Sequence, residues 1–163
     1  RDLHSFPTRR SSDLVVVYKI AIGADPNAGE LKSYLIEVCK DLGHQVIDMG
    51  DEDAIYANTA IKVAKQVANG SADKGILLCG TGIGMSIAAN KVHGAYAALL
   101  TDAYSAEKAR TSNNTNIACL GAFTIGREVA KKILGIWLTA DFDSASPSAK
   151  KVQRIIDYED GNS

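Results

Sequence analysis

The sequence predicts an α/β fold, a single Rossmann-like three-layer domain with a five-stranded parallel sheet and an extra C-terminal helix. Two observations lead to this prediction. Short apolar runs rich in β-branched residues alternate with segments whose apolar residues recur at helical spacing. The turns between them contain Gly, Asp or Asn, and we find no internal repeat. Alternation of this kind requires right-handed crossovers, which place helices on both faces of a parallel sheet.

The apolar runs are expected to be the strands. The first and third are almost unbroken, as expected of strands that are buried on both faces of the sheet. The third run, KGILLC, leads directly into a glycine-rich loop. In chain order, the expected strands are residues 15–22, 45–49, 74–79, 96–100 and 117–120.

The segments between the strands are expected to be amphipathic helices. The first ends at Gly43, the second has Asn58 as its N-cap, and Asp102 stands at the amino end of the fourth. Trp137, in the long fifth helix, is interpreted as a packing or dimer contact. In chain order, the expected helices are residues 31–42, 58–69, 85–91, 103–110, 125–139 and 149–158.

Composition excludes several classes of function. The formal net charge is −1 and no block of Lys and Arg is present, so no nucleic-acid partner is expected. No apolar run reaches the roughly 20 residues that a membrane-spanning helix needs. Cys39, Cys79 and Cys119 are odd in number and have no metal-ligand spacing, which favours free thiols in a reducing cytoplasm and predicts no metal site.

The first fourteen residues differ from the rest of the chain. The segment RDLHSFPTRRSSDL has no hydrophobic periodicity and lacks the apolar core of a signal peptide. It resembles translated sequencing-adapter read-through. We therefore expect residues 1–14 to be a non-native or disordered leader and residues 15–163 to form the domain.

Two loops are expected to form the functional site. In sheets of this class, ligands bind at the carboxyl ends of the strands, near the point where strand order reverses. The loop of residues 23–29 follows the first strand, and the loop of residues 80–84 follows the third. Asp25 lies in the first loop, and Cys79 directly precedes the second.

The segment after the third strand carries the strongest chemical signal. Three glycines at alternate positions allow close approach of a ligand and direct several N–H groups to one spot. A helix begins directly afterwards, so the loop suits a phosphate or the oxyanion of an intermediate and favours the thiolate of Cys79. The spacing is neither that of the dinucleotide fingerprint nor that of a phosphate-binding P-loop. The segment consists of Cys79, Gly80, Thr81, Gly82, Ile83, Gly84, Met85 and Ser86.

With this cysteine, the sequence resembles the ribose-5-phosphate isomerase B and galactose-6-phosphate isomerase family. The resemblance extends from about Lys19 to the last helix, nearly the whole domain. Its distinctive segments are residues 20–25 (IAIGAD), 76–91 (ILLCGTGIGMSIAANK) and 104–106 (YSA).

This resemblance implies an aldose–ketose isomerase that works through a cis-enediolate without metal or organic cofactor. Cys79 is then the group that moves the proton, with Thr81 assisting at the sugar oxygens. Asp25 binds substrate hydroxyls, and backbone N–H groups from Gly80 to Ser86 hold the enediolate. Asn113 corresponds to a family residue that is donated across the dimer, which implies a homodimer or tetramer with shared active sites.

The sequence departs from the family at several positions. Family members commonly have histidines where this chain has Pro26 and Ser112, and the second of these is credited with opening the sugar ring. Phe123 stands where an arginine is often found. The C-terminal phosphate-binding segment becomes residues 144–151 (SASPSAKK). The cations nearby are Lys150, Lys151 and Arg154, and we expect one or two of them, Lys151 included, to contact phosphate.

The missing ring-opening histidine suggests the substrate. Pentose and hexose phosphates are mostly cyclic and need acid–base help to open, whereas a four-carbon sugar phosphorylated on its terminal oxygen has no hydroxyl left for a five-membered ring. Residues 56–58 (YAN) and 112–114 (SNN) also look like the erythrulose-phosphate isomerases of erythritol catabolism, which adds Tyr56 to the expected substrate-binding residues. The favoured substrate is therefore D-erythrulose 4-phosphate.

Other functions stay open at this point. The chain could be a ribose-5-phosphate isomerase or a galactose-6-phosphate isomerase subunit that needs a partner. A non-catalytic sugar-phosphate or nucleotide-binding module on the same fold is the alternative from another class. Cys39 and Cys119 are expected in the core, and His4, His44 and His93 on the surface.

Overall fold

The structure is a computed structural model that describes residues 16–163. It contains a five-stranded parallel sheet, as the sequence predicts, and its strand order is β2-β1-β3-β5-β4. The leader expected at residues 1–14 lies outside the described residues. The strands are β1 (Lys19–Ala24), β2 (Gln45–Asp48), β3 (Lys74–Cys79), β4 (Ala97–Leu99) and β5 (Ile117–Gly121).

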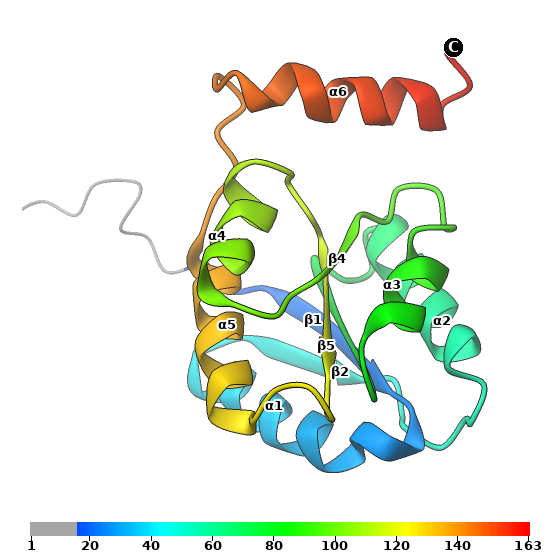
Figure 1. The fold of residues 1–163 in the computed structure, drawn as a ribbon, viewed down its shortest axis with the longest axis vertical. Coiled ribbons are helices and arrows are strands. Elements are labelled where there is room, and N and C mark those ends of the chain that lie inside the picture. Colours follow the sequence, from blue (N-terminus) through cyan, green and yellow to red (C-terminus); the bar gives the residue numbers. More distant parts are fainter. Residues whose placement is uncertain (1–15) are drawn as a thin grey trace, which may run out of the picture.

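Helices cover both faces of this sheet (Figure 1). One face packs against α1, α4 and α5 around the fully buried Trp137, and the other packs against α2 and α3 around Met85. The Trp137 indole N–H donates to the Thr115 hydroxyl at 3.0 Å, so this side chain belongs to the core of one chain. The helices are α1 (Gly29–Asp41), α2 (Tyr56–Ala68), α3 (Ile83–Ala89), α4 (Ala103–Thr111), α5 (Arg127–Thr139) and α6 (Ser148–Glu159), with a 3-10 turn η2 (Pro26–Ala28) before α1.

The strand order reverses between β1 and β3. The chain leaves β1 towards β2 at one edge of the sheet and leaves β3 towards β4 at the other edge. The two central strands run side by side in register, with Ala24 paired to Leu78. The loops that follow them therefore diverge above the same crevice, which is where ligands bind in sheets of this class.

Two of the predicted helix starts have different outcomes. Asp102 caps α4 as predicted, because its carboxylate accepts from the Ser105 N–H at 2.7 Å. Asn58 is not an N-cap, since α2 begins at Tyr56. Its side-chain amide instead donates to Asp53 at 3.0 Å, and Asp53 also accepts from the Ile55 N–H at 2.8 Å. Asp53, just before the helix, thus stabilises the first turn of α2, a role that the sequence pattern had given to Asn58.

The last helix stands apart from the sheet. In Figure 1, α6 lies at the top, and the turn from β5 into α5 lies at the bottom. Val152 is buried, and the Glu159 carboxylate accepts hydrogen bonds from the Gly94 N–H and the Tyr96 hydroxyl, just before β4. The helix is therefore attached at the amino end of the sheet. Across residues 16–163, no helix has the length and apolar character that crossing a membrane requires.

A buried cation braces the loops at the carboxyl end of the sheet. The Lys32 side chain, only 6% exposed, places its Nζ 2.7 Å from Asp48 and 3.1 Å from Asp51. Burial by itself lowers the pKa of Lys32, but the hydrogen bonds to the two carboxylates outweigh it and raise that pKa above its usual value. Burial acts against Asp48 too, yet the Lys32 ammonium and the Gly50 N–H lower the pKa of Asp48. The loop after β2 is thereby tied to α1.

We predict that Lys32→Gln lowers the free energy of unfolding by about 1–2 kcal/mol near neutral pH, a modest value because Asp48 is half exposed. Because the folded-state pKa of Asp48 is depressed, its contribution is present above the ordinary carboxylate pKa of about 3.9 and is lost as pH falls through the folded value. Urea denaturation of both proteins across this range measures the difference, which should shrink in acid.

The matched control is Lys40→Gln on the same helix. Lys40 is exposed and pairs with Glu37 at 3.8 Å, so its loss should change the unfolding free energy by less than about 0.5 kcal/mol. Equal losses of unfolding free energy for the two variants, or a Lys32 effect that grows in acid, would contradict the claim that the ion pairs of Lys32 stabilise the fold.

Candidate active site

Cys79 and Asp25 lie on neighbouring strand ends at the point where strand order reverses. Cys79 is the last residue of β3, and Asp25 follows β1 directly. The Asp25 N–H donates to the carbonyl of Leu78 at 3.0 Å, which joins the two loops at their start. Both side chains are largely buried, with 5% of Cys79 and 8% of Asp25 exposed. The structure therefore brings together Cys79 and Asp25, the predicted proton-transferring group and a predicted substrate-binding residue.

The backbone after Cys79 folds back onto its sulfur. Gly82 has a φ of +78°, a conformation that glycine adopts without strain. Its N–H donates to Cys79 Sγ at 3.0 Å, an arrangement that stabilises negative charge on the sulfur. The next N–H, of Ile83, donates to the Thr81 hydroxyl oxygen at 3.2 Å. The thiol and the hydroxyl are thus both held by the loop on which they stand.

Not every N–H of the loop is left for a ligand. Those of Gly82 and Ile83 bind the two side chains, and the Ser86 N–H donates to the Gly82 carbonyl at 3.1 Å. Within the described chain, the N–H groups of Gly84 and Met85 make no backbone bond, as is usual in the first turn of a helix. These two N–H groups are among those of the loop that can donate to a bound oxyanion.

Two aromatic rings flank the glycine loop. A Cβ on Gly84 would lie 2.5 Å from the ring of Tyr56, which begins α2, and a Cβ on Gly80 would lie 2.8 Å from the ring of Phe123. Phe123 is 72% exposed, so one side of its ring lies on Gly80 and the rest faces outwards. Tyr56 was predicted from sequence as a substrate-binding residue. The contact of Phe123 with this loop was not predicted, because it joins segments far apart in the chain.

The turn between β5 and α5 fixes the position of the loop. The Ala122 N–H donates to the Cys79 carbonyl at 2.8 Å, and the Phe123 N–H donates to the Gly80 carbonyl at 2.9 Å. Gly121 has no room for a side chain, since a Cβ there would lie 2.7 Å from the backbone of Thr81. Three consecutive residues, from Gly121 at the end of β5 to Phe123, therefore hold Cys79, Gly80 and Thr81 in place.

Asp25 also has a structural partner. Its carboxylate accepts from the backbone N–H of Asn27 at 2.9 Å and so caps the η2 turn. This bond orients the carboxylate beside the end of β3. Pro26 supplies the first residue of that turn, for which its fixed φ is well suited.

Asn113 and Lys151 lie far from Cys79 within one chain. Asn113 is exposed and follows α4, on the approach to the amino end of β5. Lys151 is exposed on α6, which is attached at the amino end of β4. Cys79 lies at the opposite, carboxyl end of the sheet. These two predicted residues can reach a Cys79 site only if they come from another copy of the chain.

The remaining histidines and cysteines of the described chain are bonded to other residues or buried in the core. His44 accepts from the Tyr18 N–H at 3.0 Å and is only half-buried, and His93 is exposed beside Asp160. Cys39 and Cys119 are fully buried, as predicted. Burial raises the pKa of Cys39 to about 12, and burial together with the neighbouring Cys79 also raises the pKa of Cys119.

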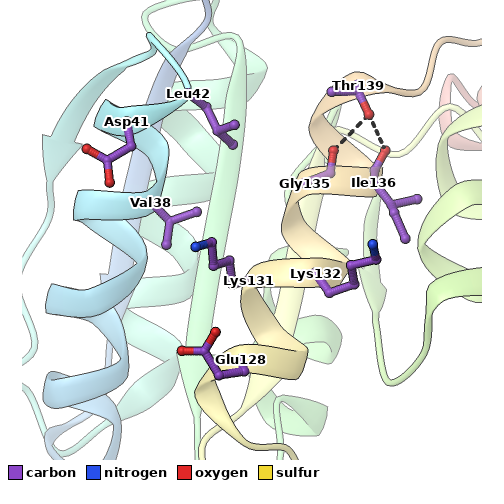
Figure 2. Close-up of a pocket in the computed structure, with 9 residues that line it drawn as sticks. All are labelled: Val38, Asp41, Leu42, Glu128, Lys131, Lys132, Gly135, Ile136 and Thr139. Carbon is purple, nitrogen blue, oxygen red and sulfur yellow. Dashed lines mark hydrogen bonds between the residues drawn. The ribbon is translucent and has the colours of Figure 1, made fainter.

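A groove between α1 and α5 encloses about 600 Å³ but holds none of this chemistry (Figure 2). Val38 and Leu42 face α5 across it, and Lys131 and Glu128 lie along its rim. It lies towards the C-terminal end of α1, away from the carboxyl ends of the strands. Residues 16–163 contain no group of three or more His, Cys, Asp or Glu side chains placed to hold a metal ion.

Comparison with known proteins identifies the family of this chain. The family model described as Ribose/Galactose Isomerase matches residues 20–155. The chain belongs to the ribose/galactose isomerase family. It is 47% identical to ribose-5-P isomerase B of Listeria innocua over 81% of this chain and 91% of that protein.

Two further members of the family bear on function and fold. The chain is 46% identical to D-erythrulose-4-phosphate isomerase of Pectobacterium atrosepticum, over 86% of this chain and 94% of that protein. The type B ribose 5-phosphate isomerase of Trypanosoma brucei has the same fold, with a TM-score of 0.84 and 36% identity over 88% of this chain and 99% of that one. This member of the ribose/galactose isomerase family is therefore an enzyme, a sugar-phosphate isomerase.

We predict that iodoacetamide near neutral pH modifies Cys79 at least about tenfold faster than the other two cysteines. Cys79 is 5% exposed and its sulfur accepts an N–H, whereas Cys39 and Cys119 are fully buried with raised pKa values. Peptide mass spectrometry over a time course gives the three rates.

The Cys79→Ala variant is the control, since it should react only at the slow rate of the two core thiols. Labelling of Cys39 or Cys119 as fast as Cys79 in the folded protein would contradict this description of the site.

Proposed function

We propose that this chain interconverts D-erythrulose 4-phosphate and the corresponding tetrose 4-phosphate through a cis-enediolate, without a cofactor and with Cys79 as the base. The observation that supports this choice of substrate is that the described chain places no histidine at the site. His44 and His93, the histidines of the described chain, have other partners, and Pro26 and Ser112 cannot move a proton. A substrate that is already open-chain needs no ring-opening acid.

The proton transfer follows from the position of the sulfur. Cys79 Sγ takes a proton from C1 of the ketose, and the electron pair forms the C1–C2 double bond while negative charge develops on O2. Return of the proton to C2, with transfer of the hydroxyl proton from O1 to O2, gives the aldose. One group on one face of the enediolate is sufficient for both transfers.

The charge on the intermediate is stabilised by the loop. The N–H groups of Gly84 and Met85, which make no backbone hydrogen bond in the described chain, can bind O2 as the oxyanion develops. The Thr81 oxygen already accepts from the Ile83 N–H, which leaves its O–H to donate to a sugar oxygen. Asp25 accepts from a hydroxyl further along the substrate, and the Tyr56 ring closes one side of the site.

Ribose 5-phosphate is the second candidate substrate. The relative from Listeria innocua is named ribose-5-P isomerase B and is as similar to this chain as the erythrulose-4-phosphate isomerase is. Identity therefore does not decide between the two sugars. The missing histidine favours the tetrulose.

We also propose that the active enzyme is a homodimer with shared sites. Large apolar side chains around the carboxyl end of the sheet are exposed in one chain, with 64% of Ile55, 52% of Ile83, 59% of Ile87 and 70% of Tyr104 accessible. A second copy that covers them removes this area from water. It also supplies the route by which Asn113 and the α6 cation Lys151 reach the Cys79 of a partner. The free thiols suit a reducing cytoplasm.

The first prediction here concerns Cys79 and the substrate. The protein should turn over erythrulose 4-phosphate with a higher kcat/KM than ribose 5-phosphate, and Cys79→Ala should lose at least about a thousandfold in kcat, because a base that acts only in the transition state is removed. Coupled assays of both sugars with both proteins measure this. A preference for ribose 5-phosphate would refute the substrate, and full activity of Cys79→Ala would refute the mechanism.

The second prediction concerns the shared site. Cys79→Ala and Asn113→Ala homodimers should each be nearly inactive, but chains of both kinds unfolded and refolded together should regain about a quarter of wild-type activity. Half of the randomly paired dimers then combine the two variants, and each of these has one site with both residues intact. Mixing without unfolding is the control. No recovery above the separate variants would contradict sharing.

A further inference from the structure

A side pocket of about 430 Å³ adjoins the Cys79 site. It lies between the start of α1 and the turn from β5 into α5. Asn27, whose side chain and N–H both face Asp25, lines one end of it, and Phe123 lines the other. The other residues that line it are Glu30, Leu31, Tyr34, Ala122, Ile125, Gly126 and Arg127.

Phe123 separates this pocket from the glycine loop. Its Cδ2 and Cε2 atoms lie 2.8 and 3.0 Å from the point where a Cβ of Gly80 would be, so the ring lies directly against the loop. The same residue lines the side pocket. The ring is held at this place by the backbone, because the Phe123 N–H donates to the Gly80 carbonyl at 2.9 Å. The ring thus lies between the side pocket and the glycine loop, over which the proposed substrate binds.

We propose that Phe123 determines specificity by limiting the length of the sugar phosphate that the site accepts, an inference that rests on the proposed isomerase function. The phenyl ring can neither hydrogen-bond a hydroxyl nor neutralise a phosphate. A longer substrate therefore makes no favourable polar contact with the ring and is excluded by it sterically. A four-carbon chain over Cys79 ends before the ring, whereas longer chains need the space beyond it.

The groups behind the ring suit the distal end of a longer sugar phosphate. Arg127 stacks its guanidinium over the Tyr34 ring, 5.0 Å from its centre, and can bind a phosphate as a bidentate donor. Asn27 and Glu30 offer amide and carboxylate groups for hydroxyls. Removal of the ring should join the side pocket to the space over the glycine loop and let five- and six-carbon substrates reach these groups.

The test compares Phe123→Ala and Phe123→Leu with wild type on erythrulose 4-phosphate, ribulose 5-phosphate and a 2-ketohexose 6-phosphate. We expect Phe123→Ala to raise the ratio of kcat/KM for the five-carbon to that for the four-carbon substrate by at least about tenfold, mainly through KM, with Phe123→Leu in between. The backbone hydrogen bond to Gly80 survives both substitutions. Val129→Ala, an exposed α5 residue outside the pocket, is the control and should leave the ratio unchanged.

The outcomes separate this proposal from the proposed substrate. If wild type prefers the five-carbon sugar, the tetrulose assignment fails, and the same comparison of the six-carbon with the five-carbon substrate decides the role of Phe123. If no sugar is turned over, the ratios of calorimetric Kd values for the three phosphates decide it. A ratio that stays within about twofold of wild type in both variants, on any of these scales, overturns the role of Phe123.

Discussion

The lack of space around the loop after β3 is the constraint on which the site depends. Side chains on Gly80, Gly82 or Gly84 would lie within 3 Å of neighbouring atoms, and a side chain on Gly121 would strike the loop from the β5 side. This packing forces the backbone to turn back at Gly82 and so places an N–H 3.0 Å from the Cys79 sulfur. The neighbours belong to α2, β4 and the β5–α5 turn, which means that most of the domain contributes to the position of one thiol.

In the proposed dimer, the chemistry is divided between one chain and its partner. Around Cys79, the described chain offers a thiol, a hydroxyl, a carboxylate and backbone N–H groups, which suit the reacting carbons of a sugar. The nearby cation Lys32 is occupied by Asp48 and Asp51. For the phosphate of the four-carbon substrate, the proposed dimer brings Lys151 from the amino end of another sheet. On this account one chain binds the reacting end of the substrate, and the partner binds the phosphate.

The sequence was sufficient for the fold and for the proximity of Cys79 and Asp25. The run KGILLC followed by alternate glycines predicts β3 with its bounds, and the buried strand ends place Cys79 and Asp25 together. It was not sufficient for contacts between distant segments. Nothing near Phe123 indicates that its ring lies on Gly80, and Lys32 looks like an exposed helix residue until the loop after β2 is in place. The N-cap of α2 was misplaced because Asp53, three residues before the helix, satisfies its first turn through a loop.

The central claim, that Cys79 moves the substrate proton through an enediolate, is tested most directly by isomerisation in deuterated water followed by NMR. With wild-type protein we predict that deuterium enters the carbon-bound position that receives the proton, at C2 of the aldose and C1 of the ketose. With Cys79→Ala, whose Gly82 turn keeps its packing, we predict no exchange above the uncatalysed rate. Exchange by Cys79→Ala at the wild-type rate would contradict the account, because another group would then be the base.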